Sequence, residues 1–189
     1  MFGIRYLKSP ATMYVQHYSG GRIKQEGTGL AFYYFAPRSV IVQLPVSSVD
    51  VPFAFTEATA DFQDATLQGN LTYRVSDPQR LAKLLNYTIG RNGRYESDDP
   101  SKLGERLVQA AQIGARQFIH RQPLRDVLVG SAALVDAMRQ SLVESPTLTQ
   151  LGIEALEVAI VSIDADPEMT KALGGAHDAL CDCFQAAFV

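Results

Sequence analysis

The sequence has 189 residues, which is long enough for one domain with a sizeable core or for two small subdomains. Its formal net charge of −3, without any basic run, excludes a nucleic-acid partner held by bulk electrostatic attraction. No window approaches the ~20 apolar residues of a spanning helix, and we expect no secretory signal.

The first part of the chain reads as a series of strands. Residues 12–18 and 22–25 flank Ser19-Gly20-Gly21, a pattern that predicts a two-stranded hairpin with a glycine turn. Residues 30–36 form the most apolar run and contain four consecutive aromatic residues. Residues 39–46 and 49–55 alternate in polarity, and Pro45 in the first of these indicates an edge strand or a bulge.

The stretch from Ala65 to Val75 shows the strictest pattern in the chain. Its odd positions are uncharged and its even positions are all polar, which places one set of side chains on each face of a strand. This pattern predicts a long strand in a half-buried antiparallel sheet, with helices covering the dry face.

Aspartate-proline and related pairs then introduce helices. Asp77-Pro78 predicts a helix with the apolar stripe Leu81, Leu84 and Leu85. Residues 88–98 read as an exposed loop before Asp99-Pro100, which is expected to cap a second helix. The apolar face of that helix is expected to contain Leu103, Leu107, Ala110, Ala111, Gly114 and Phe118.

The remaining elements are a short helix, a longer helix, a strand and a final helix. Gln122-Pro123 is expected to start the short helix, and Ser145-Pro146 to stop the longer one. Residues 152–163 return to strand, and Asp166-Pro167 predicts the last helix. The inward positions are expected to be Leu134, Met138 and Leu142 in the longer helix, and Leu156, Val158 and Ile160 in the strand.

This order predicts an α+β fold. An antiparallel, β-rich N-terminal part with a long central strand is followed by helices packed on one face, a returning strand and a C-terminal helix.

Several short motifs, weak singly and specific together, resemble the band 7, or SPFH, family of stomatins, prohibitins and flotillins. The closest match is the strand end Leu71-Thr72-Tyr73-Arg74-Val75-Ser76-Asp77-Pro78. The resemblance covers roughly residues 10–172. The other matching segments are Glu26 to Leu30 with Pro37, Val49-Asp50-Val51, Thr59-Ala60-Asp61, Leu124 to Leu128, and Leu151-Gly152-Ile153 with Ile160 and Ile163.

The resemblance implies a single SPFH-like domain over residues 1–176. Residues 1–57 would form its β-rich, membrane-proximal part and residues 58–166 its α/β part. Residues 167–189 would form the start of a C-terminal helix. It also implies a cytoplasmic, peripherally membrane-associated scaffold without catalysis or cofactor. Its expected partners are the lipid surface, copies of itself, and membrane proteins such as proteases.

Two features usual in the family are not expected here. Members usually begin with a membrane-spanning or hairpin segment and continue into a long coiled coil, and the sequence shows neither pattern. We therefore expect either an excised domain or a member that has lost both devices, with correspondingly weaker self-assembly.

The aromatic run Phe32, Tyr33, Tyr34 and Phe35 is the candidate site. As a surface it would lie among lipid headgroups, where tyrosine fits with one wet end. As an ordinary strand it would place alternate rings in the core. The resemblance favours membrane proximity for this segment.

Two candidate metal clusters are better explained without a metal. Asp164, Asp166 and Glu168 are typical of a strand end followed by a helix cap and first turn. His177 and Cys181 share a helix face, but Cys183 points away and a second ligand pair is missing. Cys181 and Cys183 are also too close together for a disulfide, which favours a reducing compartment.

Two other classes of function remain open. The first is a soluble ligand- or peptide-binding module that uses a sheet edge or a pocket between sheet and helices. The second, which ranks last, is an enzyme that uses the acidic cluster with a divalent ion. No catalytic sequence motif supports a particular reaction.

Overall fold

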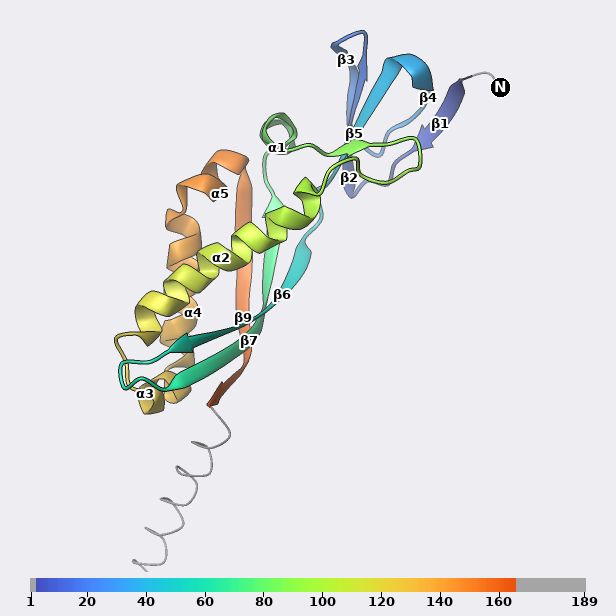
Figure 1. Cartoon of the computed structure of the whole chain (residues 1–189). Coiled ribbons are helices and arrows are strands. Elements are labelled where there is room, and N and C mark those ends of the chain that lie inside the picture. Colours follow the sequence, from blue (N-terminus) through green and yellow to red (C-terminus); the bar gives the residue numbers. More distant parts are fainter. Residues whose placement is uncertain (1–2, 166–189) are drawn as a thin grey trace, which may run out of the picture.

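The computed structural model describes residues 3–165, which form an elongated molecule with strands at one end and a helix-covered sheet at the other (Figure 1). The strands are β1 (Ile4–Lys8), β2 (Met13–Ser19), β3 (Arg22–Thr28), β4 (Ala31–Phe35), β5 (Ser39–Pro45), β6 (Val49–Ala58), β7 (Asp64–Val75), β8 (Thr88–Ile89) and β9 (Ile153–Ala165). The helices are η1 (Ala36–Arg38), α1 (Pro78–Leu84), α2 (Asp99–Ile119), α3 (Leu124–Val129), α4 (Ser131–Glu144) and α5 (Pro146–Leu151).

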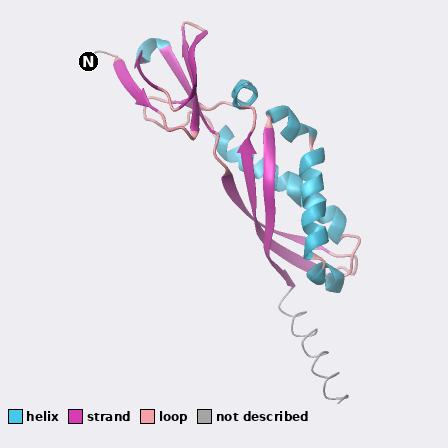
Figure 2. Cartoon of the chain, turned by 180° about the vertical axis from the view of Figure 1, so that it is seen from behind, coloured by secondary structure: helices cyan, strands magenta, loops and turns pink. Residues whose placement is uncertain are grey.

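The strands make three antiparallel sheets. A two-stranded ribbon pairs β1 with β4, a four-stranded sheet has the order β3-β2-β5-β8, and a three-stranded sheet has the order β6-β7-β9. Helices lie on one side of the three-stranded sheet in both views (Figures 1 and 2). The predicted α+β fold is therefore confirmed.

The central strand β7 behaves as its alternation predicts. The odd positions from Ala65 to Val75 are buried, whereas Gln68 and Arg74 on the other face are exposed. Strand β7 pairs along its length with β6 on one side and β9 on the other. Because β6 belongs to this sheet, the sheets change between β5 and β6; the division expected at residue 57 stays a prediction.

The predicted start of α1 is confirmed, and the predicted cap of α2 is wrong. The Asp77 carboxylate accepts a hydrogen bond from the Arg80 amide at 3.0 Å, with proline following as the sequence indicates. In α2 the N-cap position falls on Asp98, and the Asp99 carboxylate instead accepts from the amide of Asn86 at 2.9 Å. Asp99 thus ties the helix to the preceding loop.

Three further expectations for the helical half need correction. Leu84 is 54% exposed because α1 ends there, so its stripe does not extend to that residue. Residues 88–98 are not wholly loop, because Thr88–Ile89 pairs with β5. Ser145-Pro146 ends α4, but the proline also occupies the first turn of α5, a helix that the sequence did not reveal.

The returning strand β9 carries two extra residues that reverse part of its expected pattern. The register with β7 shifts so that Leu156 and Val161 have no direct partner. Each is a bulge residue, and their side chains are 42% and 78% exposed. Leu156 was therefore wrongly expected to point inward, whereas Val158 is buried as expected.

The N-terminal sheet is packed on both faces. One face contributes to the main core through the side chains of Tyr14, Val42 and Leu44. The predicted hairpin of β2 and β3 is confirmed, with positive φ angles at Gly20 and Gly21. Pro45 is the last residue of β5 and has a strand partner on one side only, Met13 of β2, as expected for an edge position; β8 flanks β5 only at Ile41 and Val42.

Candidate functional site

The β1–β4 ribbon presents a set of large apolar side chains to solvent. Register partners share a face of an antiparallel pair, and the register joins Ile4 to Phe35 and Tyr6 to Tyr33. These four side chains are 62%, 48%, 55% and 74% exposed, in that order. The rings of Tyr6 and Tyr33 lie 4.8 Å apart. We call this surface the outer ribbon face.

The structure divides the predicted aromatic run between two faces. Tyr33 and Phe35 lie on the outer ribbon face, where both side chains are exposed to solvent. Phe32 and Tyr34 are half-buried on the inner side, where their ring centroids lie 5.0 and 6.0 Å from that of His17. Phe32 and Tyr34 are not part of the main hydrophobic core, so the expectation of alternate rings in the core is not met, and membrane contact stays a prediction.

Two residues of this face were missed in the sequence. Ile4 and Tyr6 come from a lead segment that is too short to classify alone, and β4 begins about 25 residues later in the chain. Their period-two spacing was the available signal. Only the strand pairing shows that they continue the surface of Tyr33 and Phe35.

Local backbone contacts hold the ribbon in place. The Ser9 amide donates to the Leu30 carbonyl at 2.8 Å, and the Ala36 amide donates to the Gly3 carbonyl at 2.7 Å. Gly29, with a φ of 66°, makes the turn into β4 that a residue with a side chain rarely adopts. These two hydrogen bonds extend the pairing of β1 with β4 by one residue at each end of the ribbon.

The charge around this end of the molecule differs in sign from the charge elsewhere. Residues 1–46 contain five lysines and arginines and a single acidic residue, Glu26. The Glu26 carboxylate accepts hydrogen bonds from Tyr14, Gln16 and Gln79. The rest of the chain has 12 basic and 19 acidic residues. The N-terminal end is therefore the basic pole of an acidic protein.

A small pocket of about 310 Å³ lies under the ribbon, between its inner side and the β2–β3–β5 sheet. His17 is 8% exposed and its Nε2 lies 3.0 Å from the Ser39 hydroxyl. Burial, and then the nearby charge of Lys24, lower the pKa of His17 below its ordinary value. The lower pKa favours the neutral imidazole.

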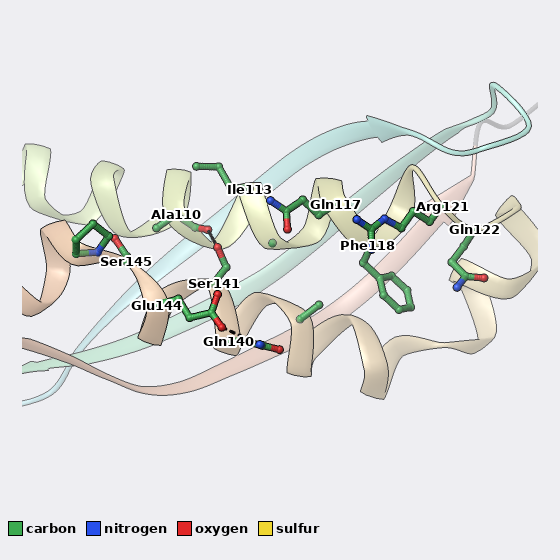
Figure 3. A pocket seen from close by; sticks show the side chains of 13 residues that line it. Ala110, Ile113, Gln117, Phe118, Arg121, Gln122, Gln140, Ser141, Glu144 and Ser145 are labelled. Carbon is green, nitrogen blue, oxygen red and sulfur yellow. Dashed lines mark hydrogen bonds between the residues drawn. The ribbon is translucent and has the colours of Figure 1, made fainter.

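A larger groove of about 570 Å³ runs between α2 and α4 (Figure 3). Ile113 and Gln117 border it from α2, Arg121 from the turn that follows α2, and Ser141 and Glu144 from α4. The Ser141 hydroxyl donates to the Ala110 carbonyl at 2.8 Å, and Gln140 donates to Glu144 at the same distance. One of these bonds joins the two helices and the other lies along α4, so the polar groups are paired with one another.

Glu57, on β6, is a buried carboxylate that faces α2. It accepts hydrogen bonds from Arg116 through two nitrogens, at 2.8 and 3.1 Å, and from Gln112 at 2.7 Å. Burial raises the pKa of Glu57, but the bonds from Arg116 and Gln112 outweigh it, so the pKa lies below its ordinary value. This pattern is typical of a structural ion pair.

The candidate metal residues are only partly described. Asp164 is exposed and accepts a hydrogen bond from the Ser162 hydroxyl at 2.8 Å. Asp166, Glu168, His177, Cys181 and Cys183 lie outside the described residues. Within residues 3–165, the structure shows no group of three or more histidine, cysteine, aspartate or glutamate residues that could hold a metal ion.

No helix in the described part of the chain combines the length and the apolar character needed to cross a bilayer. A family model described as SPFH domain / Band 7 family matches residues 10–179. The comparison with curated proteins gives no match for this chain.

Proposed function

Because the chain belongs to the SPFH domain / Band 7 family, we propose that it is a non-catalytic scaffold domain that lies on a membrane through its outer ribbon face. The observation that carries the proposal is the exposure of Ile4, Tyr6, Tyr33 and Phe35 on one side of the ribbon. Clustered exposed apolar side chains mark interaction surfaces in soluble domains.

The chemistry of this face suits the boundary between lipid headgroups and acyl chains. Tyrosine buries its ring among apolar atoms and keeps its hydroxyl hydrated. Lys8 is the register partner of Ala31 and leaves the ribbon on the same side as Tyr6. A lysine near an anionic surface contributes about 1 kcal/mol, so the face combines apolar insertion with weak electrostatic attraction.

The proposed scaffold also includes self-association through the helical layer. Ile113 on α2 and Val143 on α4 are 54% and 71% exposed, away from the ribbon. Such side chains would be covered by a neighbouring copy, and the assembled domains would organise membrane microdomains or enclose membrane proteins such as proteases. We place the domain at the cytoplasmic surface of a membrane.

Replacing Tyr33 and Phe35 together with serine is expected to weaken vesicle binding about tenfold, because two exposed rings lose their apolar contact with lipid. Co-flotation with vesicles of phosphatidylcholine and phosphatidylserine measures the effect. Val129→Ser is the matched control, because Val129 is 83% exposed on α3 at the other end of the molecule. Equal flotation of all three proteins would contradict the proposal.

Replacing Ile113 and Val143 with glutamate is expected to shift the protein toward the monomer, with at least a tenfold increase in the dissociation constant. Charges introduced in an apolar contact lose hydration without gaining a partner. Sedimentation velocity over a range of protein concentrations measures the shift. Val161→Glu, on the sheet side of the molecule, should leave the association unchanged.

A peptide-binding module remains the second candidate function. A groove of about 560 Å³ lies between the edge strand β6 and the first half of α2, lined by Val51, Phe53 and Val108 among others. An extended peptide can add to such an edge. Pro52 interrupts the donors of this strand, which disfavours a continuous ladder. This candidate would be supported if the protein stays monomeric, does not bind vesicles and binds peptides saturably.

A further inference from the structure

The pocket under the ribbon gathers hydrogen-bond donors on one side and aromatic rings on the other. Lys24, Gln25, Ser19 and Ser39 line it together with His17, whereas Phe32 and Tyr34 belong to the ribbon above. Lys24 lies opposite the point where the β2–β3 register shifts between His17 and Tyr18. An extra residue of this kind re-aims its side chain.

The charge of this pocket is entirely positive among the described residues that line it. No ion pair joins Lys24 to an acidic side chain within residues 3–165. Glu26 is the register partner of Gln16, so it leaves the sheet on the opposite face from His17 and bonds there. Arg22 pairs in register with Ser19 and leaves the sheet on the pocket face.

We propose that this pocket binds a phosphate monoester, which in the membrane-bound protein is the headgroup of an anionic lipid such as phosphatidic acid. The Lys24 ammonium supplies the charge, and the hydroxyls of Ser19 and Ser39 and the imidazole of His17 supply neutral donors. The volume of about 310 Å³ accommodates a phosphate group with its first carbon atoms.

The position of the pocket connects it to the outer ribbon face. Tyr33 and Phe35 border both surfaces, so a headgroup in the pocket belongs to a lipid lying beside the inserted rings. The lipid assignment rests on the proposed membrane function. The binding of a phosphate monoester itself does not, and it can be tested without a membrane.

The first test titrates the protein with glycerol 3-phosphate and with inorganic phosphate, and follows the histidine ring resonances by NMR. The resonances of His17 are expected to shift saturably and those of His120, near the distant end of α2, to stay unchanged. Lys24→Gln should weaken binding about tenfold, whereas Lys8→Gln, on the outer ribbon face, should leave it unchanged. Unchanged resonances of His17, or equal effects of the two variants, would overturn the proposal that this pocket binds phosphate.

The second test compares vesicles containing phosphatidic acid with vesicles containing phosphatidylserine at matched surface charge. The protein is expected to prefer phosphatidic acid, and Lys24→Gln to remove this preference while leaving binding to phosphatidylserine within about fivefold. Lys8→Gln should weaken both equally. Vesicle binding without any preference overturns the headgroup assignment and leaves the membrane function standing. Saturable phosphate binding without vesicle binding supports the pocket and removes the membrane function.

Discussion

Replacing Glu57 with alanine is expected to lower the free energy of unfolding by about 2–3 kcal/mol. The carboxylate is 5% exposed and accepts three hydrogen bonds from Arg116 and Gln112. Removing one partner of a buried ion pair costs about 3–5 kcal/mol. The Arg116 side chain is 55% exposed and regains water when its partner is lost, so the expected cost lies at or just below the lower end of that range. Chemical denaturation at pH 7 measures the difference.

The ion pair between Arg74 and Glu154 supplies a matched control. It also joins an arginine and a glutamate, at 2.6 Å, but both side chains are about half exposed. Such surface pairs contribute about 0–1 kcal/mol, so Glu154→Ala should be nearly neutral. Equal losses of unfolding free energy in Glu57→Ala and Glu154→Ala would show that burial does not increase the contribution of the Glu57 carboxylate to stability.

The same carboxylate predicts a dependence on acid. The folded protein holds the pKa of Glu57 below its ordinary value, so the contribution of the pair is fully present above the unfolded-state pKa near 4.5. It is lost as the pH falls through the lower pKa of the folded state. The stability advantage of the wild type over Glu57→Gln should therefore shrink on acidification below about pH 4.5, and denaturation at pH 7 and pH 3.5 measures it.

The elements that the sequence predicts well are those fixed by neighbouring residues. Two local signals determine the conformation of the residues that carry them: the alternation from Ala65 to Val75 and the Asp77-Pro78 pair. The strand, its buried face and the helix start are consequently confirmed. A family resemblance on the same residues is confirmed as well.

The errors arise where a distant partner decides the outcome. The side chain of Leu156 is turned outward because β9 must match the register of β7, which lies about 85 residues earlier. Pro146 is a local exception, because a proline that stops one helix also fits the first turn of the next one. The candidate surface shows the same limit, since Ile4 and Tyr6 gain meaning only through their pairing with β4.

Two glycines of α2 predict opposite results for the same substitution. A Cβ at Gly114 would lie 2.6 Å from the Ala137 carbonyl oxygen, 2.7 Å from the Ser141 Cβ and 3.0 Å from the Met138 Cα, all on α4. A Cβ at Gly104 would meet only the Val51 side chain, at 3.4 and 3.5 Å. The first glycine is needed for the close approach of two helices, and the second is not.

Gly114→Ala is therefore expected to destabilise the protein by about 2 kcal/mol, and Gly114→Val by more. Overpacking costs about 1–3 kcal/mol, and here two of the three close atoms are helix backbone that cannot rotate away. Gly104→Ala is expected to be neutral or to stabilise by up to about 1 kcal/mol, because alanine is the better helix former. Denaturation midpoints of the three variants measure the contrast. Similar changes for Gly104→Ala and Gly114→Ala would mean that helix propensity alone governs both sites and that α2 and α4 separate without cost.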